Sequence, residues 1–317
     1  MRIFTAGATG AVGRQLVPLL SARGHEVVGT TTSAAKADGV RAAGAEPVVL
    51  DVLDGRAVME AVRQAAPEVV VHEATALTDL SSPRKLDQSF ALTNRLRTEG
   101  TDHLLAAARA AGARRFVAQS YAGWPYAHEG GPVKSESDPL DPDPPKAFRR
   151  TLDAIRHLEE AVTGAEGLEG VVLRYGGFYG PGTSLAADGE HVEAVRRGKF
   201  PIVGSGEGVW SFVHIEDAAA ATVAAIEGEA NGIFNIVDDE PAPVAEWLPA
   251  LAAAIGARPP RHVPAWVGRL VGGEPTVVLM TEIRGASNAK AKRELGWRLA
   301  YPSWRDGFKT LALARAA

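Results

Sequence analysis

Short apolar runs alternate with amphipathic stretches along the first third of the chain. The runs are Ile3–Thr5, Val27–Thr31, Pro47–Leu50, Val69–Val71 and Arg115–Gln119. The stretches between them have helical spacing and are Val12–Ala22, Ala34–Ala43, Arg56–Gln64 and a long one that ends near Ala111. Because strands that are apolar throughout are buried on both faces, this alternation predicts a doubly wound parallel sheet of the Rossmann type.

The alternation stops at residues 130–145, a segment rich in proline, aspartate and glycine that cannot be one regular element. Later elements are predicted as helices at Phe148–Val162, Glu216–Glu227, Ala245–Ile255 and Ala289–Leu295, and as strands at Val171–Arg174, Pro201–Val203 and Ile233–Ile236. We therefore expect an α/β fold with a Rossmann domain over residues 1–175. A smaller α+β substrate lobe, interleaved with it, is expected over residues 176–317. The acidic turn Asp238-Asp239-Glu240 is expected to be a solvated loop.

Composition narrows the classes of function. A net charge of −4 gives no basic field for nucleic acid. The chain has no cysteine, which excludes disulfides and thiolate chemistry and fits a reducing, cytoplasmic compartment. No apolar stretch approaches the roughly 20 residues of a membrane span, so no membrane partner is expected. Met1–Thr5 leads straight into a glycine-rich turn, which leaves no room for a signal peptide.

Three glycines stand at the first junction between a strand and a helix. Gly7, Gly10 and Gly13 have the spacing of a dinucleotide-binding turn, in which glycine allows the tight turn, the approach of the pyrophosphate and close packing of helix on strand. The phosphates would lie at the positive end of the helix dipole. The expected binding segment is Gly7, Ala8, Thr9, Gly10, Ala11, Val12 and Gly13.

The end of the second strand bears on which dinucleotide binds. NAD usually requires an acid there for its ribose hydroxyl, but this strand ends in Thr31, Thr32 and Ser33, with Lys36 nearby. These residues suit a 2′-phosphate, so NADP(H) is favoured over NAD(H). Lys36 as a plain solvated helix residue is an equal alternative. Asp51 is placed to accept from the adenine amino group, or else to cap a helix.

Several segments, in this order, resemble the extended short-chain dehydrogenase/reductase superfamily of NAD(P)-dependent epimerases, dehydratases and reductases. They are Gly7–Gly13, Asp51-Val52, His72–Thr75, Phe116–Ser120, Leu173–Gly182, Phe212–Asp217 and Glu294–Trp297. The resemblance extends over essentially the whole chain and implies a small-molecule substrate and a homodimer. It also implies further cofactor contacts from Val52, Ala74, Thr75, Tyr175, Gly176 and Phe178.

The chain departs from this family where the family carries out its proton chemistry. Members use a Ser or Thr together with a Tyr and a Lys four residues later in one helix. Ser120 stands at the position of the family Ser, whereas Phe148 and Leu152 stand at the positions of the Tyr and the Lys. Neither Phe148 nor Leu152 can carry a proton.

Two more departures concern binding. Trp210 stands where many members have the Arg that holds the diphosphate of a nucleotide sugar, so a nucleotide-sugar substrate is disfavoured. Arg97 replaces an Asn expected three residues before Gly100-Thr101, and Asn94 could substitute only with a local insertion.

Other polar groups near Ser120 are therefore candidates for catalysis. Ser120 would polarise a carbonyl, and the proton would come from Tyr126, Tyr121 or water. Lys134 or Arg149 could lower the pKa of such a Tyr. The alternative is that these tyrosines only pack in an aromatic wall. Expected substrate-lining residues, each of which could instead be a packing or structural residue, are Trp124, Phe148, Phe178, Trp210 and His214.

The leading hypothesis is an NAD(P)-dependent oxidoreductase, or an epimerase or dehydratase, that acts on a small hydroxy or carbonyl compound other than a nucleotide sugar. A substrate that needs little acid catalysis would tolerate Phe148 and Leu152. The rival hypothesis is a catalytically silent NADP(H)-binding sensor. His72-Glu73 has no second His at ligand spacing and is interpreted as structural, so no metal is expected.

Overall fold

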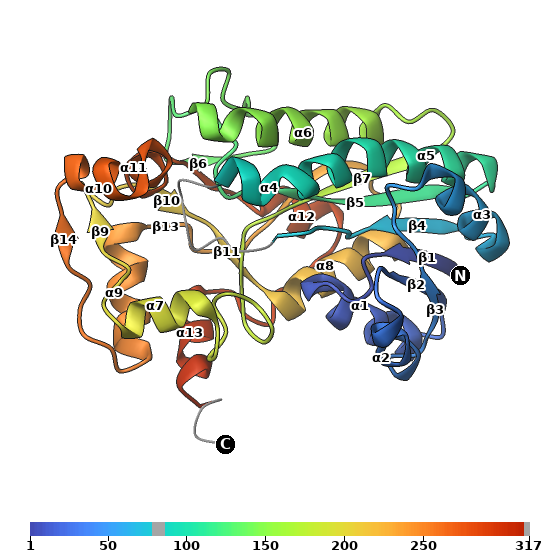
Figure 1. Cartoon of the computed structure of the whole chain (residues 1–317), viewed down its shortest axis with the longest axis horizontal. Coiled ribbons are helices and arrows are strands. Elements are labelled where there is room, and N and C mark those ends of the chain that lie inside the picture. Colours follow the sequence, from blue (N-terminus) through green and yellow to red (C-terminus); the bar gives the residue numbers. More distant parts are fainter. Residues whose placement is uncertain (78–85, 314–317) are drawn as a thin grey trace.

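The computed structural model describes residues 1–77 and 86–313 and contains one central parallel sheet (Figure 1). Its strand order is β12-β7-β5-β4-β1-β2-β3. The strands are β1 Arg2–Ala6, β2 Glu26–Thr31, β3 Ala45–Val49, β4 Val69–His72, β5 Arg115–Tyr121, β7 Glu169–Tyr175 and β12 Gly232–Ile236. Every neighbouring pair is parallel, which confirms the predicted doubly wound Rossmann sheet.

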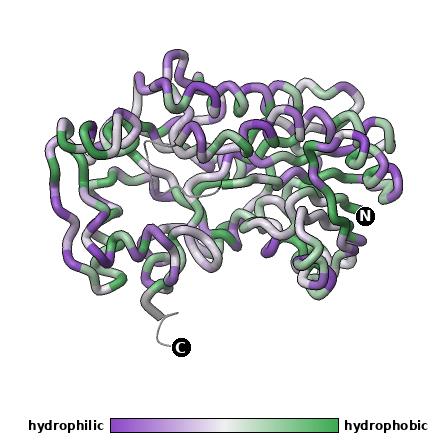
Figure 2. Tube along the Cα trace, viewed as in Figure 1, coloured by the Kyte–Doolittle hydropathy of each residue, from purple (hydrophilic) through white to green (hydrophobic). Residues whose placement is uncertain are grey.

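Helices cover both faces of this sheet, as continuous apolar strands require. One face packs on α1 (Ala11–Ala22) and α8 (Ile215–Glu227), and the other packs on α3 (Gly55–Ala65), α5 (Thr101–Ala110) and α6 (Lys146–Thr163). Hydrophobic positions follow the strands, and the outer turns of α6 are hydrophilic (Figure 2). β12 and α8 come from the second half of the chain, so that half completes the sheet begun by the first.

Two predicted helices are interrupted. The stretch 34–43 forms a 3₁₀ turn, Ala34–Lys36, followed by α2, Ala37–Ala42. The long stretch that ends near Ala111 forms α4 (Leu86–Arg95), a π-helical turn (Leu96–Gly100) and α5. A π-helical turn accommodates one extra residue in a helix and occurs frequently at functional sites. This turn lies between Asn94 and Thr101, but one extra residue is fewer than the three positions that separate Asn94 from Arg97.

The smaller lobe consists of short elements around a separate apolar core. The helices of this lobe are α7 Glu190–Arg196, α9 Val244–Ala254, α10 Ala265–Gly272, α11 Glu274–Thr281 and α13 Trp304–Leu313. Helix α12, Ala289–Glu294, packs instead against β12 of the central sheet. The strands of the lobe form two-residue or three-residue pairs: β6 Val133–Lys134 with β15 Gly285–Ala286, β8 Gly177–Tyr179 with β11 Phe212–His214, β9 Ile202–Val203 with β14 His262–Val263, and β10 Val209–Trp210 with β13 Ala242–Pro243. No helix in the described part of the chain is long and apolar enough to cross a membrane.

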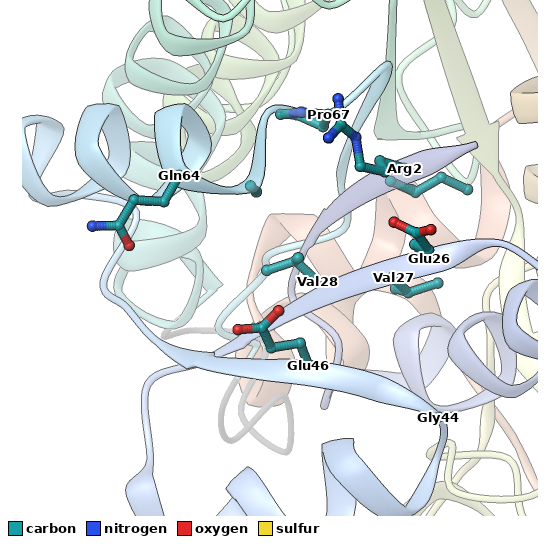
Figure 3. A pocket seen from close by; sticks show the side chains of 10 residues that line it. Arg2, Glu26, Val27, Val28, Gly44, Glu46, Gln64 and Pro67 are labelled. Carbon is teal, nitrogen blue, oxygen red and sulfur yellow. The ribbon is translucent and has the colours of Figure 1, made fainter.

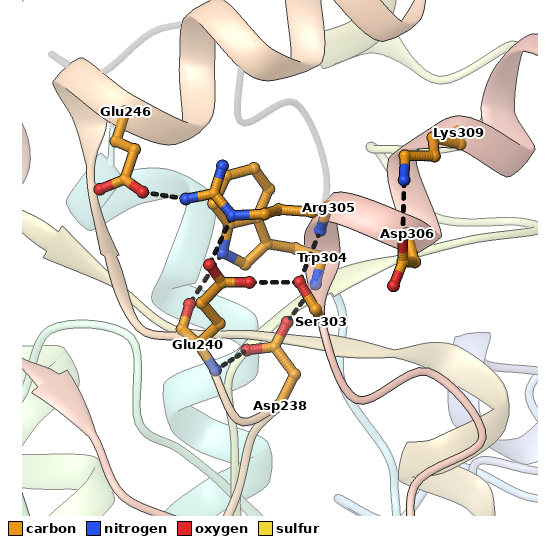
Figure 4. Close-up of polar contacts among 8 residues, drawn as sticks. All are labelled: Asp238, Glu240, Glu246, Ser303, Trp304, Arg305, Asp306 and Lys309. Atoms are coloured by element: carbon orange, nitrogen blue, oxygen red, sulfur yellow. Dashed lines mark hydrogen bonds and ion pairs between the residues drawn. The ribbon is translucent and has the colours of Figure 1, made fainter.

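The expectation of a solvated acidic loop at residues 238–240 is wrong. Asp238 is buried, and its carboxylate accepts from the backbone N–H of Trp304 at 2.8 Å, at the start of α13 (Figure 4). Burial raises the pKa of this carboxyl to about 8. Glu240 pairs with Arg305, which also reaches Glu246. The turn is acidic in sequence, but α13 packs over it, a long-range contact that local composition does not reveal.

Candidate functional site

The glycine turn has the close backbone packing that its spacing predicts. Gly7 has a φ of +93°, and a Cβ there would lie 2.6 Å from the carbonyl oxygen of Glu73. A Cβ on Gly13 would lie 2.2 Å from the carbonyl oxygen of Gly7. Gly10, the residue before α1, donates its N–H to that same oxygen at 3.0 Å. The N-terminus of α1 is thus brought to the end of β1 with no side chain in the way, which suits a bound pyrophosphate.

Hydroxyl groups hold this turn against the end of β2. Thr30 Oγ1 accepts from the N–H of Gly7 at 3.1 Å, and Thr31 Oγ1 accepts from the N–H of Ser33 at 3.2 Å. Thr9 Oγ1 lies 3.5 Å from Thr31 Oγ1. Thr32 and Lys36 are exposed beyond the strand. Thr31 is therefore turned inward as a structural group, while Thr32, Ser33 and Lys36 reach the surface beside the turn.

The residues after β3 and β4 lie along the same edge of the sheet. Asp51 is exposed and accepts from the N–H of Leu53 at 3.0 Å, whereas the N-cap of α3 is Asp54. The alternative that Asp51 caps that helix is therefore wrong. His72 is buried and bonds the carbonyl of Leu96 at 3.0 Å, and burial lowers its pKa to about 4. Ala74 is half-buried and Thr75 is exposed, so the chain opens to solvent directly after Glu73.

Glu73 is a buried acid directly below the glycine turn. Burial raises its pKa to about 8. Its Oε1 lies 3.0 Å from the hydroxyl of Tyr175, which lies 2.7 Å from Thr222 Oγ1. Tyr175 thus uses its polar atom within the protein, and its ring packs 5.3 Å from that of Phe178. Gly176, which was also expected to contact the cofactor, is buried as well. Phe178 and its neighbour Gly177 are half-buried.

Ser120 and Tyr126 belong to a buried polar network. Ser120 donates to Glu159 Oε1 at 2.7 Å, and Glu159 is paired with Arg174 through contacts of 2.7 and 2.5 Å. Tyr126 is fully buried, donates to Asn235 at 2.6 Å, and accepts from Arg174 at 2.9 Å. Both hydroxyls therefore already have partners inside the fold.

Tyr121, the last residue of β5, is half-buried and differs from both, because no hydrogen bond of its hydroxyl to the described residues is found. Its hydroxyl occupies the space beside Gly123, where a Cβ would lie 2.2 Å from it. Neither cation expected to act on this tyrosine lies there. Lys134 donates to the carbonyl of Glu129, and Arg149 pairs with Asp143. The positive charge that acts on Tyr121 belongs to buried Arg97, although burial prevails and raises the Tyr121 pKa to about 12.

The aromatic residues expected around the substrate lie in three separate places. Trp124 stacks on Phe148 with centroids 4.4 Å apart, in an apolar cluster that includes Leu152, Val278 and Ile283 and also touches Tyr121 and Trp210. Trp210 donates its indole N–H to the carbonyl of Leu279 at 2.8 Å. His214 lies outside this cluster: it stacks on Tyr301, and its Nδ1 accepts from the N–H of Glu216 at the start of α8. Phe178 packs instead on the core of the Rossmann side.

Two cavities lie outside this arrangement. One of about 360 Å³ lies among Arg2, Glu26, Glu46 and Gln64, at the end of the sheet opposite the glycine turn (Figure 3). The other, of about 550 Å³, lies between residues 127–149 and the pair α10 and α11, and it shares Val278 with the apolar cluster. In the described part of the chain no group of His, Asp or Glu side chains is placed to hold a metal ion.

A family model described as the NAD dependent epimerase/dehydratase family matches residues 3–237. The chain belongs to this family. The chain is thus an NAD(P)-dependent enzyme of the oxidoreductase or epimerase type in the short-chain dehydrogenase superfamily.

Proteins similar to this chain in sequence or in structure cover nearly its whole length. A Streptomyces protein named 3-diazoavenalumate denitrifying reductase is 50% identical over 310 residues, which covers 97% of this chain and 99% of the relative. A Thermus thermophilus UDP-glucose 4-epimerase solved with NAD has a TM-score of 0.75 at 27% identity, with all of both chains covered. A Thermotoga maritima UDP-glucose 4-epimerase has a TM-score of 0.78 at 23% identity, with 100% and 99% covered.

The α6 helix has no residue able to carry a proton at the two positions singled out from the sequence. It contains no tyrosine, and its only lysine is Lys146, the first residue of the helix. Phe148 and Leu152 are both buried and apolar, and they pack with Trp124, Val278 and Ile283. From the sequence, Arg97 was identified only as the replacement for the Asn expected before Gly100-Thr101. Its electrostatic effect on Tyr121 could not be found from spacing, because the two residues are 24 positions apart and belong to different elements.

Proposed function

We propose that this protein uses NADPH to remove nitrogen from an aromatic diazonium compound, replacing N2 by hydride. The observation that carries this proposal is the apolar pair Phe148 and Leu152, buried in one cluster with Trp124. By the resemblance to the family, these two residues stand where its members have the Tyr and the Lys. A site of this kind favours a reaction that needs hydride but no proton. The name of the 50% identical Streptomyces protein describes a reduction of this type, which supports the proposal.

The balance of the reaction explains why no acid is required. The net change is one hydride added to the ring carbon and one N2 lost with the electron pair of the former C–N bond. A dinucleotide held by Gly7–Gly13 would supply this hydride as the two-electron reductant. Because the diazonium group is a cation and its leaving group is neutral, no proton enters or leaves. Ketone reduction, by contrast, needs a proton on the alkoxide.

The residues around the site would then act by binding and by excluding water. The rings of Trp124 and Phe148 offer an aromatic wall for a planar substrate, and Leu152 keeps water from the face of α6. Tyr121, whose pKa is about 12, stays protonated and would donate a hydrogen bond to the substrate. Trp210 offers no positive charge for a diphosphate, so a nucleotide sugar fits poorly. Ser120 and Tyr126 support the wall through their bonds to Glu159, Arg174 and Asn235.

NADP(H) is proposed over NAD(H) because the end of β2 carries no acid. Exposed Thr32 and Lys36 and half-buried Ser33 would hold the 2′-phosphate, and Gly7–Gly13 would hold the pyrophosphate. Asp51 would accept from the adenine, and Val52, Ala74, Thr75 and Phe178 would line the path to the nicotinamide. Lys36→Ala should raise the Kd for NADPH at least fivefold and leave that for NADH unchanged. Arg41→Ala, a change on the neighbouring α2, is the control.

The reaction is tested directly with the intact protein, NADPH and a stable benzenediazonium carboxylate labelled with ¹⁵N. We expect NADPH oxidation, equimolar labelled N2, and transfer of deuterium from [4-²H]NADPH to the ring carbon. Reduction of ketones without release of N2 would show a ketoreductase instead. Tight NADPH binding without turnover of either substrate class would favour a sensor, and both results would overturn the proposal.

A further inference from the structure

Arg97 is a buried cation without a partner in the described part of the chain. Only 4% of the residue is exposed, and its Nε and Nη1 atoms are inaccessible and make no hydrogen bond. Burial lowers its pKa, but only to about 10, so the side chain is charged at neutral pH. Because an unpaired buried charge is costly, such residues usually have a partner or a function.

Glu159, the carboxylate whose charge acts on Arg97, does not neutralise it. Glu159 acts on Arg97 electrostatically, but both of its oxygens bond Arg174, and one also accepts from Ser120. Glu159 and Arg174 therefore cancel as a pair, and the charge of Arg97 remains in excess. His72, which also feels Arg97, is neutral because burial holds its pKa near 4.

The charge of Arg97 acts on Tyr121, the last residue of β5. Arg97 lies in the π-helical turn between α4 and α5, and Tyr121 ends β5, where the apolar cluster of Trp124 and Phe148 begins. Gly123 leaves the space that the Tyr121 hydroxyl occupies. In the same turn region, Asn94 Oδ1 is also buried without a partner, while its Nδ2 donates to Thr151 at 3.1 Å.

We propose that Arg97 and Tyr121 form an anchor for a negatively charged oxygen of the substrate, a carboxylate or a phenolate. The proposal rests on the proposed function, since it assigns the substrate a second, anionic group. Tyr121 donates a hydrogen bond to that oxygen, and Arg97 supplies the charge. A positive side chain also repels a diazonium group, so the substrate is oriented with its anion toward Arg97 and its cation away from it.

The anchor is tested by calorimetric titration of the NADP⁺-loaded protein, which needs no turnover. The probes are cinnamate, which carries only a carboxylate, 4-nitrophenolate, which carries only a phenolate, and neutral cinnamamide. Arg97→Gln should weaken at least one anion 10-fold or more and leave cinnamamide and NADP⁺ binding unchanged. Whichever anion loses affinity identifies the group that the anchor holds. Arg95→Gln, two residues away on an exposed side chain paired with Glu99, is the matched control and should change nothing.

Two results would overturn the anchor: equal weakening of cinnamamide and the anions, or unchanged binding of both anions. If Arg97→Gln does not fold, Tyr121→Phe removes only the hydroxyl and should weaken the same anion 3- to 10-fold, while equal binding by this variant would overturn the anchor. The test is independent of the reaction, because a protein that releases no N2 can still show charge-selective binding that depends on Arg97. A protein that releases N2 without such binding would retain the proposed function and lose the anchor.

Discussion

Glu73→Gln should make the protein less sensitive to alkaline pH. Glu73 is buried below the glycine turn, where a full charge is poorly solvated, and its pKa is about 8 in the folded state against 4.5 for an ordinary Glu. Its Oε2 has no hydrogen-bond partner, and Oε1 has only Tyr175. Gln has the shape of the protonated acid and cannot ionise.

The size and sign of the effect follow from the two pKa values. A carboxyl whose pKa is raised on folding stabilises the folded state fully below about pH 4.5, and this contribution is lost as the pH rises through about 8. One pKa unit corresponds to about 1.4 kcal/mol, so the loss across this window is at most about 4 to 5 kcal/mol. Relaxation of the site and entry of water would reduce it.

Urea unfolding of the two proteins at several pH values between 5 and 9 measures this effect. We expect the free energy of unfolding of the natural protein to fall relative to that of Glu73→Gln, with a slope approaching 1.4 kcal/mol per pH unit between pH 5 and 8. The difference should then level off. Asp238 also titrates in this range, but it lies in the smaller lobe and cancels in the comparison. Parallel pH profiles would refute the argument, because they would mean that Glu73 has the same pKa in both states.

Three further predictions follow from the packing. Gly13→Ala should abolish dinucleotide binding, measured by NADPH fluorescence, because its Cβ would lie 2.2 Å from the Gly7 carbonyl oxygen. Gly39→Ala, which has open space around its Cβ, should bind normally. Glu159→Gln should destabilise the fold by about 3 to 5 kcal/mol in urea unfolding, since buried Arg174 loses its counter-charge, and a loss below 1 kcal/mol would contradict this. Phe148→Tyr should leave the rate of N2 release and its pH dependence nearly unchanged if no proton is needed, whereas a large increase in rate would argue for an acid-limited step.

The sequence by itself determined the architecture and the cofactor class. Apolar strands alternating with amphipathic helices allow few arrangements other than a doubly wound sheet. The spacing of Gly7, Gly10 and Gly13 indicates where the backbone must pack closely, since at Gly7 and Gly13 a Cβ would collide with the backbone. Such features depend on residues near in sequence, and they were predictable for that reason. That Phe148 and Leu152 stand at the positions of the family's Tyr and Lys stays a prediction from the sequence.

Only the tertiary structure decided which polar groups remain available at the site. Ser120 and Tyr126 looked as suitable as Tyr121 until long-range partners, Glu159, Asn235 and Arg174, were seen to occupy them. The burial of Asp238 under α13 and the placement of Arg97 near Tyr121 arise in the same way. Whether a side chain is buried, paired or charged depends on neighbours far away in sequence, and only folding brings those neighbours together.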